Sequence, residues 1–376
     1  MRYARLFMAG SLLVMGLATV SAQEATTPLG EIPGLNAPRH LTLDAADNVI
    51  VAIAGTGGEE AAKITLGEGL VGNTGSAISI ASDGTPSELI GGLYSFASPM
   101  NEVVGVHKVL VSDSGIWYLM GQGPVEGDAP AIEDTFALIL VNGDEKMVID
   151  LYANEVANNP DGGEIDSNPV DFDVAPDGSA IYIADAGANA VLKWTEADGV
   201  STFAAWEPVT GEPQAVPTSV LADVDGNLYV SFLTGFPFPT GGSRIEKYDP
   251  EGNLLQTIEG LTMVTDLFWG LDTTTLYAVQ FAESFGDMGW TPNSGSVILV
   301  GAEGLTPVIT GLNLPYSGLE AGGGTFVVSV NTSFLPAGSG ALWALNAGDY
   351  KAYSESMAAG IGEAMPEPAT TEQPGG

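Results

Sequence analysis

The sequence predicts an all-β fold, a six-bladed β-propeller of four-stranded blades. The first observation is a repeat: an apolar alternating run, a turn rich in Asp and Gly, and an aliphatic–aromatic strand recur six times. The second is spacing, because the centres of these second strands lie about 47 to 67 residues apart and a four-stranded blade needs about 40 to 50 residues. The third is the scarcity of helix signals, which are confined to residues 151–157. A double β-sandwich is the competing fold, but it gives no reason for one phrase to recur six times. The six strand centres are Ile50, Trp117, Tyr182, Tyr229, Tyr277 and Val327.

The composition limits the chemistry that this chain can perform. Its 376 residues include no cysteine and two histidines, which excludes disulfide frameworks, cysteine-based metal sites and a three-histidine zinc site. Ten basic residues against 47 acidic ones give a formal charge of −37. Such a surface repels nucleic acids and anionic lipids, and it attracts hard cations such as Ca²⁺. Solubility in a saline exterior is the alternative explanation for this charge.

The first element along the chain is a signal peptide. Residues 1–22 combine Arg2 and Arg5, an apolar run over residues 6–20, and small residues before a cleavage site that precedes Gln23. We therefore expect a secreted or periplasmic protein. No later stretch reaches eighteen uninterrupted apolar residues, so we expect no membrane span.

A closing segment, the blades and a tail follow in that order. Within residues 23–37, the part from 26 to 35 can supply an outer strand to the last blade and so close the ring. Residues 38–346 hold the six copies of the repeat. Residues 347–376 are crowded with Pro, Glu, Thr and Gly, which predicts a flexible acidic tail or tether.

The clearest copy of the repeat spans residues 168–194. Ile181, Tyr182 and Ile183 form an unbroken apolar run, which is typical of a strand that is packed on both faces. The dipeptide Asp177–Gly178 before this run suits a type I′ hairpin turn, in which both central residues have positive φ.

Three stretches of the sequence resemble a known family. Residues 152–172 (YANEVANNPDGGEIDSNPVDF) and 216–253 resemble signatures of ScyD/ScyE family proteins, and the LTGFPFPTGG segment within the second is quite specific. Residues 34–55 resemble that family's first blade, with His40 where Gly is expected. The resemblance covers nearly the whole mature chain except the tail, and it implies an exported, six-bladed, NHL-like propeller. Some members of the family belong to cyanobacterial clusters that make the indole–phenol sunscreen scytonemin, and no reaction is implied for the others. Gluconolactonase-like propellers carry Ca²⁺ or a similar ion on the axis, but their ligand motif is not recognisable in this sequence.

Candidate site residues come from the loops that open on one face of a propeller. These loops precede the first strand of each blade or connect its second and third strands. Carboxylate and amide oxygens that converge there suit a hard cation, so we expect an axial site for Ca²⁺ or another divalent cation. A water-filled polar channel is the alternative. The predicted metal ligands are Glu102, Asn168, Asp171 and Asp266. The predicted ligand-binding residues are Arg39, His40, Asn101, Asp185, Phe236, Phe238, Gln280, Glu320 and Asn331.

Two loops add hypotheses of their own. In residues 233–242, Phe236 and Phe238 alternate with prolines that stiffen the backbone, so their rings can stack on a flat ligand. A hydrophobic plug between blades is the alternative for this loop. The acidic loop over residues 158–168 is interpreted as a solvated turn in preference to a calcium loop.

Together these observations predict an exported ScyD/ScyE-like scaffold that binds a small molecule or a protein at one face, with a cation on the axis. The alternative is a metal-dependent extracytoplasmic enzyme, either a lactonase-like hydrolase or an enzyme that acts on aromatic precursors. Such an enzyme would use Glu102 or Asp171 as a base beside a metal-bound water, and His40 is a further candidate base. His107 is expected to be a packed or channel-facing residue. A surface component tethered by its tail is a third hypothesis.

Overall fold

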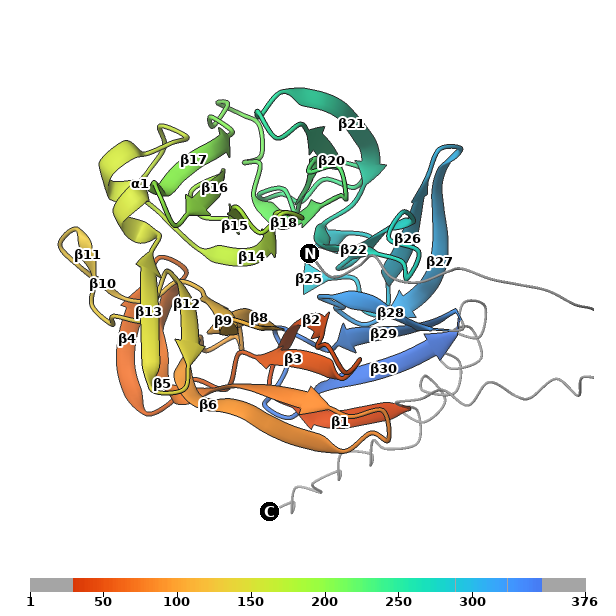
Figure 1. Ribbon diagram of the computed structural model, residues 1–376, viewed down its shortest axis with the longest axis horizontal. Coiled ribbons are helices and arrows are strands. Elements are labelled where there is room, and N and C mark those ends of the chain that lie inside the picture. The colour runs from red at the N-terminus through yellow and green to blue at the C-terminus, as the bar shows by residue number, and fades with distance from the viewer. Residues whose placement is uncertain (1–29, 288, 323, 347–376) are drawn as a thin grey trace, which may run out of the picture.

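Six antiparallel β-sheets are arranged radially around a common axis (Figure 1). This computed structural model describes residues 30–287, 289–322 and 324–346. The prediction of an all-β propeller with six four-stranded blades is confirmed, and the first blade carries two additional strands. The predicted signal peptide and tail lie outside the described residues.

Blades 1 to 3 come from the first half of the chain, and their strands are given from the axis outwards. Blade 1 consists of β2 (Pro38–Leu43), β3 (Val49–Ile53), β5 (Gly67–Ile80) and β6 (Pro86–Ala97), with β4 (Glu60–Ile64) paired to β5 and β7 (Val103–Val104) paired to β6. Blade 2 consists of β8 (Val106–Ser112), β9 (Gly115–Met120), β12 (Ala137–Asn142) and β13 (Glu145–Asp150). Blade 3 consists of β14 (Pro169–Val174), β15 (Ile181–Asp185), β16 (Ala190–Thr195) and β17 (Gly199–Ala205).

Blades 4 to 6 complete the ring. Blade 4 consists of β18 (Pro217–Ala222), β19 (Leu228–Phe232), β20 (Ser243–Tyr248) and β21 (Leu254–Leu261). Blade 5 consists of β22 (Val264–Trp269), β23 (Leu276–Gln280), β26 (Gly295–Gly301) and β27 (Gly304–Leu312). Blade 6 consists of β28 (Gly318–Gly322), β29 (Thr325–Val330), β30 (Gly340–Asn346) and β1 (Glu31–Leu35). The loops hold two small hairpins and a helix: β10 (Val125–Glu126) with β11 (Ala129–Pro130), β24 (Phe285–Gly286) with β25 (Gly289–Trp290), and α1 (Tyr152–Asn158).

The second strand of a blade packs on both faces, and its sequence reflects this. All five residues of β3 and all five of β15 are buried. The outer strand β21 exposes most of its residues because it borders solvent. Six hydrophobic clusters fill the spaces between adjacent blades, one for each neighbouring pair. The blades are therefore held together by apolar packing between sheets.

The hairpin turn of blade 3 differs from the predicted type. Gly178 has a φ of 73°, but Asp177 does not adopt positive φ, so the prediction of a type I′ turn is wrong. The N–H of Gly178 instead bonds to the carbonyl of Ala175, which makes residues 175–178 the turn and leaves Pro176 at a position that its fixed φ favours.

The ring is closed by strands from both ends of the described chain. Strand β1 pairs antiparallel with β30 and forms the outer edge of blade 6. This pairing covers an edge of β30 that would otherwise be free to associate with other strands. Within the described residues, no helix is long and apolar enough to cross a membrane.

Candidate functional site

Each blade contributes one polar residue to a ring on the axis, which we call the axial ring. In the sequence each is the third residue of a Pro- or Val-led tripeptide: PRH, VHK, PVD, PTS, VTD and PYS. In five of the inner strands the pairing register shifts beside this residue, which marks a β-bulge. Because a bulge re-aims the side chains of its strand, it brings these residues together on the axis. The axial ring consists of His40, Lys108, Asp171, Ser219, Asp266 and Ser317.

Ring residues tie neighbouring blades together through backbone hydrogen bonds. Four side chains of the axial ring each accept a hydrogen bond from a backbone N–H of an adjacent blade. In each case this N–H belongs to the residue that directly follows the adjacent blade's own ring residue. Because these N–H groups are buried, losing the acceptor would leave each of them unsatisfied. The four bonds run from Leu41 N to Ser317 Oγ (3.0 Å), Val220 N to Asp171 Oδ2 (3.0 Å), Leu267 N to Ser219 Oγ (3.1 Å) and Gly318 N to Asp266 Oδ2 (3.1 Å).

A buried ion pair lies within the ring. The Nζ of Lys108 donates to Oδ1 of Asp171 at 2.8 Å, and Oγ of Ser219 donates to Oδ2 of the same carboxylate at 2.7 Å. Burial alone would raise the pKa of Asp171, but Lys108 and His40 hold it below its ordinary value. Burial likewise opposes the charge on Lys108, but the surrounding carboxylates raise its pKa. Both groups are therefore charged at neutral pH.

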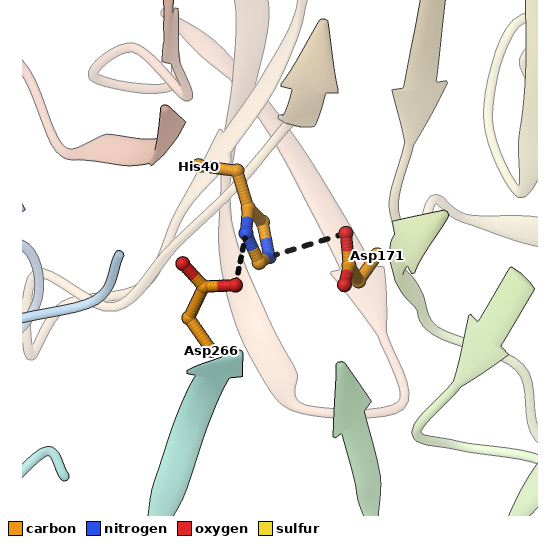
Figure 2. A group of neighbouring side chains, drawn as sticks. All are labelled: His40, Asp171 and Asp266. Atoms are coloured by element: carbon orange, nitrogen blue, oxygen red, sulfur yellow. Dashed lines mark ion pairs between the residues drawn. The ribbon is translucent and has the colours of Figure 1, made fainter. Parts of the chain in front are cut away.

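His40 lies between the two aspartates of the ring (Figure 2). Its Nδ1 is 3.3 Å from Oδ1 of Asp266, and its Nε2 is 3.9 Å from Oδ1 of Asp171. All three side chains are buried. Among the described residues this is the one group of three or more His, Asp or Glu side chains whose ligand atoms all lie within 4.8 Å of one another. The group therefore has the composition and spacing to hold a metal ion.

The donor atoms of this trio favour some ions over others. The buried Nε2 of His40 has no hydrogen-bond partner, so it is free to coordinate an ion. One imidazole and two carboxylates suit a divalent transition metal better than Ca²⁺, which prefers oxygen ligands alone. The ammonium of Lys108 already neutralises Asp171 from 2.8 Å. A metal ion at this position would have to compete with that charge.

Arg39, His107 and Tyr316 cover one end of the axial ring. The guanidinium of Arg39 lies 5.1 Å from the centre of the Tyr316 ring, and Nδ1 of His107 shares a 3.2 Å hydrogen bond with the Tyr316 hydroxyl. Arg39 donates to the backbone carbonyls of Val103 (2.5 Å) and Thr332 (2.6 Å). Burial holds the pKa of His107 well below its ordinary value, so the imidazole is neutral. Arg39 is 3% exposed and His107 is 4% exposed, whereas Tyr316 is half-buried.

The remaining predicted metal ligands lie outside the trio. Glu102 is close enough to Arg39 for the guanidinium to oppose the rise in its pKa that burial causes. Asn168 directs its Oδ1 to the N–H of Gln122, at 3.1 Å. The structure thus groups His40 with Asp171 and Asp266, and it places Glu102 and Asn168 in the loops around the axis.

The other predicted ligand-binding residues are engaged at separate places, Asp185, Gln280 and Glu320 in strands and Asn101 and Asn331 in loops. Asn101 and Asn331 line one small cavity of about 50 Å³, which has room for water but not for a sugar-sized molecule. The remaining three side chains accept hydrogen bonds from their own surroundings. These bonds run from Asn168 N to Asp185 Oδ1 (2.6 Å), Thr262 N to Gln280 Oε1 (2.6 Å) and Leu271 N to Glu320 Oε2 (3.0 Å).

Phe236 and Phe238 belong to a larger group of rings that we call the aromatic cap. It is built by the β19–β20 loop, the β24–β25 hairpin and the loop after β29, and consists of Phe236, Phe238, Phe285, Trp290 and Phe334. The centre of the Phe238 ring lies 4.7 Å from that of Trp290 and 5.3 Å from that of Phe285. Phe236 stands on this layer and is 73% exposed. The inner rings thus hold one aromatic side chain out into solvent.

Sequence reasoning did not select two members of the axial ring, Lys108 and Ser317. The signal for them was present in the recurring tripeptide, whose third position is polar in all six blades. Phe285, Trp290 and Phe334 were also not grouped with the predicted aromatic loop. They are distant in sequence and meet it only in the folded chain.

No family model matches this sequence, and no curated protein matches it either. Solved structures are similar to it in fold. A protein of unknown function from Bacteroides thetaiotaomicron has a TM-score of 0.50 at 10% identity, over 83% of this chain and 70% of that one. Virginiamycin B lyase from Staphylococcus aureus has a TM-score of 0.45 at 13% identity, over 81% and 85% of the two chains. A gluconolactonase from Xanthomonas campestris has a TM-score of 0.32 at 14% identity, over 67% and 92%. At these identities the similarity concerns the fold alone.

Proposed function

We propose that this chain is an exported, ScyD/ScyE-like propeller that acts as a binding scaffold, with a flat aromatic ligand seated on the aromatic cap. The observation that carries the proposal is Phe236, which is 73% exposed above a layer of packed rings. Exposing a large apolar ring to water is unfavourable, and a planar ligand would remove that surface from water. The resemblance to a family with some members in clusters that make an indole–phenol compound supports an aromatic ligand.

The rigidity of the cap supports binding without a large loss of conformational entropy. Pro237 and Pro239 flank the rings in sequence, and Phe238 is wedged between Phe285 and Trp290. Phe238 is therefore fixed, and the support beneath Phe236 loses little freedom when a ligand stacks on the Phe236 ring. Phe236 meets the rings of Phe238 and Phe285 edge-on, an arrangement that aromatic groups prefer, so a further ring can extend the same packing.

The axial ring is assigned a structural role in this proposal. Its carboxylates are hydrogen-bonded to adjacent blades, and Lys108 balances the charge of Asp171. A base for hydrolysis has to reach a substrate or a bound water. Asp171 is instead fully buried, and four donors contact it: the Nζ of Lys108, the Oγ of Ser219 and two backbone N–H groups.

Ligand binding at the cap is tested with indole as the probe. Saturation-transfer NMR on the full chain should show magnetisation transfer to indole, and Phe236→Ala should reduce it at least threefold. Leu254→Ala is the matched control, because Leu254 is also exposed but lies on the outer strand of blade 4. Equal transfer to indole in the wild type and in a folded Phe236→Ala variant would refute the proposal.

A metal-dependent role is the second candidate, and the unpartnered Nε2 of His40 favours it. The distance of 3.9 Å between this nitrogen and Oδ1 of Asp171 leaves room for an ion that is bonded to both. When bound, such a metal would polarise a substrate or a water molecule. Elemental analysis of the purified protein decides this candidate. One tightly bound transition metal per chain that is lost in His40→Ala supports it, and no metal after dialysis against Zn²⁺ or Mn²⁺ excludes it.

Export is proposed from residues 1–22. The N-terminal sequence of the protein recovered from its source should begin at Gln23. Recovery of chains that begin at Met1 from the cytoplasm would contradict export and leave the binding proposal standing.

A further inference from the structure

A cavity of about 430 Å³ lies between blades 3 and 4, where the β14–β15 and β18–β19 hairpins turn. Small-molecule sites in proteins usually have volumes of about 300–1,000 Å³, so this cavity is large enough for a ligand. Its hairpins join the first and second strands of their blades, whereas the loops of the aromatic cap follow second strands. Because adjacent strands are antiparallel, the cavity and the cap lie at opposite ends of the sheets.

Charged groups of both signs line this cavity. Lys193 comes from β16, and the carboxylates of Asp177 and Asp225 come from the two hairpin turns. Hydrogen bonds from Ser179 hold the pKa of Asp177 below its ordinary value, and the charge of Lys193 adds to this effect. Among the described residues, Lys193 nevertheless forms no ion pair with a carboxylate, whereas three other lysines do. The opposite charges of the cavity are therefore near one another but unpaired.

The ammonium of Lys193 is held over an aromatic ring. Its Nζ lies 5.5 Å from the centre of the Tyr182 ring, and the two residues pair directly across β15 and β16. Tyr182 is 4% exposed, and the ring of Phe203 meets it edge-on with the ring centres 5.0 Å apart. Because the cation–π contact restricts the movement of the ammonium, less conformational entropy is lost when a ligand binds it.

The apolar part of the lining is exposed to solvent. It includes Pro176, Val224 and Pro250, and the side chain of Val224 is 69% exposed. Three turns carry these side chains, and each is closed by a backbone hydrogen bond: residues 175–178, 223–226 and 249–252. The apolar lining is therefore preformed, and a ligand that covers it removes apolar surface from water.

We propose that this cavity binds a free α-amino acid with an apolar side chain. The ammonium of Lys193 would receive the carboxylate of the ligand, and Asp177 and Asp225 would accept hydrogen bonds from its ammonium group. The side chain of the ligand would cover the apolar lining. A ligand with a negative charge alone would be repelled by the two carboxylates and by the formal charge of −37, and a ligand with a positive charge alone would face Lys193.

The test is calorimetric titration of the full chain with L-leucine. The wild type should bind one leucine, and Lys193→Met should weaken binding by at least about tenfold, because the carboxylate of the ligand loses its counter-charge. Lys63→Met is the matched control, since Lys63 is exposed on β4 of blade 1 and lies outside the cavity. This variant should bind leucine as the wild type does.

Two analogues of leucine test the requirement for both charges. 4-Methylpentanoate lacks the ammonium group, and 3-methylbutylamine lacks the carboxylate. Each should bind at least about tenfold more weakly than leucine. An affinity for either analogue equal to that for leucine would overturn the proposal.

Two further variants keep the outcome decisive. If Lys193→Met does not fold, Asp177→Asn replaces it and should weaken leucine binding by at least about threefold, because Asn keeps the shape of Asp without its charge. Phe236→Ala should leave leucine binding unchanged, and its loss in that variant would place leucine at the aromatic cap and contradict the proposal. No saturable binding in the folded wild type, or unchanged affinity in both Lys193→Met and Asp177→Asn, would also refute it.

Discussion

Replacing Asp171 with Ala should destabilise the propeller more than any other single change in the axial ring. The carboxylate accepts hydrogen bonds from Lys108 Nζ (2.8 Å), Ser219 Oγ (2.7 Å), Phe172 N (2.8 Å) and Val220 N (3.0 Å). Its removal leaves the Lys108 ammonium buried without a counter-charge. Breaking one side of a buried ion pair costs about 3–5 kcal/mol. We expect the free energy of unfolding to fall by about that amount.

Urea denaturation followed by circular dichroism measures this loss, with Asp144→Ala as a control at an exposed turn residue. The control should change the free energy of unfolding by less than about 0.5 kcal/mol. The double variant Lys108→Met, Asp171→Asn removes both charges, and it should be more stable than Asp171→Ala by about 2 kcal/mol. A loss below about 1 kcal/mol in Asp171→Ala, or a double variant less stable than the single one, would refute the assignment of a buried ion pair.

Three smaller predictions concern other parts of the fold. Ser317→Ala removes the acceptor for Leu41 N and a donor to Asp266, so the free energy of unfolding should fall by about 1–3 kcal/mol. An unchanged midpoint of urea denaturation would contradict this prediction. Gly121→Ala would place the new Cβ 2.6 Å from Nε2 of His107. This overpacking should lower the free energy of unfolding by about 1–3 kcal/mol and with it the melting temperature, and an unchanged melting temperature would contradict the close packing at Gly121. The free energy of unfolding should fall as the pH rises from about 4.5 through about 7, because burial raises the pKa of Glu155 to about 7 in the folded chain against 4.5 ordinarily, so that folding favours the protonated form. Glu155→Gln should flatten this pH dependence, and an equally steep profile in that variant would contradict its assignment to Glu155.

The blade pattern could be predicted because it is local. The unbroken apolar run at Ile181–Ile183 follows from burial on both faces of one strand, and the repeat shows that the same strand recurs. The hairpin turn was predicted in the wrong class because Asp177–Gly178 fits two turn types. Pro176, one residue earlier, decides between them.

The axial ring could be predicted only in part because it depends on a bulge. Asp171 and Asp266 were expected near the axis, and the bulges beside them set which residue of each inner strand faces it. A shift of one residue turns a side chain to the other face of its sheet, and the composition of a strand does not show where such a shift occurs. Lys108 was not expected as a partner of Asp171 because the two residues are 63 positions apart and come from different blades.

The aromatic cap and the burial of Glu155 depend on contacts between segments that are separate in the sequence. Phe236 and Trp290 come from different blades, and nothing in either loop alone indicates that the two segments meet. Glu155 was not predicted to be buried because a single Glu on a short helix is ordinarily exposed. Its burial here results from the packing of α1 against the loop that follows it.

A crystal structure of the full chain soaked with indole tests the central claim most directly. We predict electron density for indole against the exposed ring of Phe236, with the axial ring unchanged. Density for indole beside His40 on the axis, with the cap bare, would show that binding is centred on the axis and would contradict the claim.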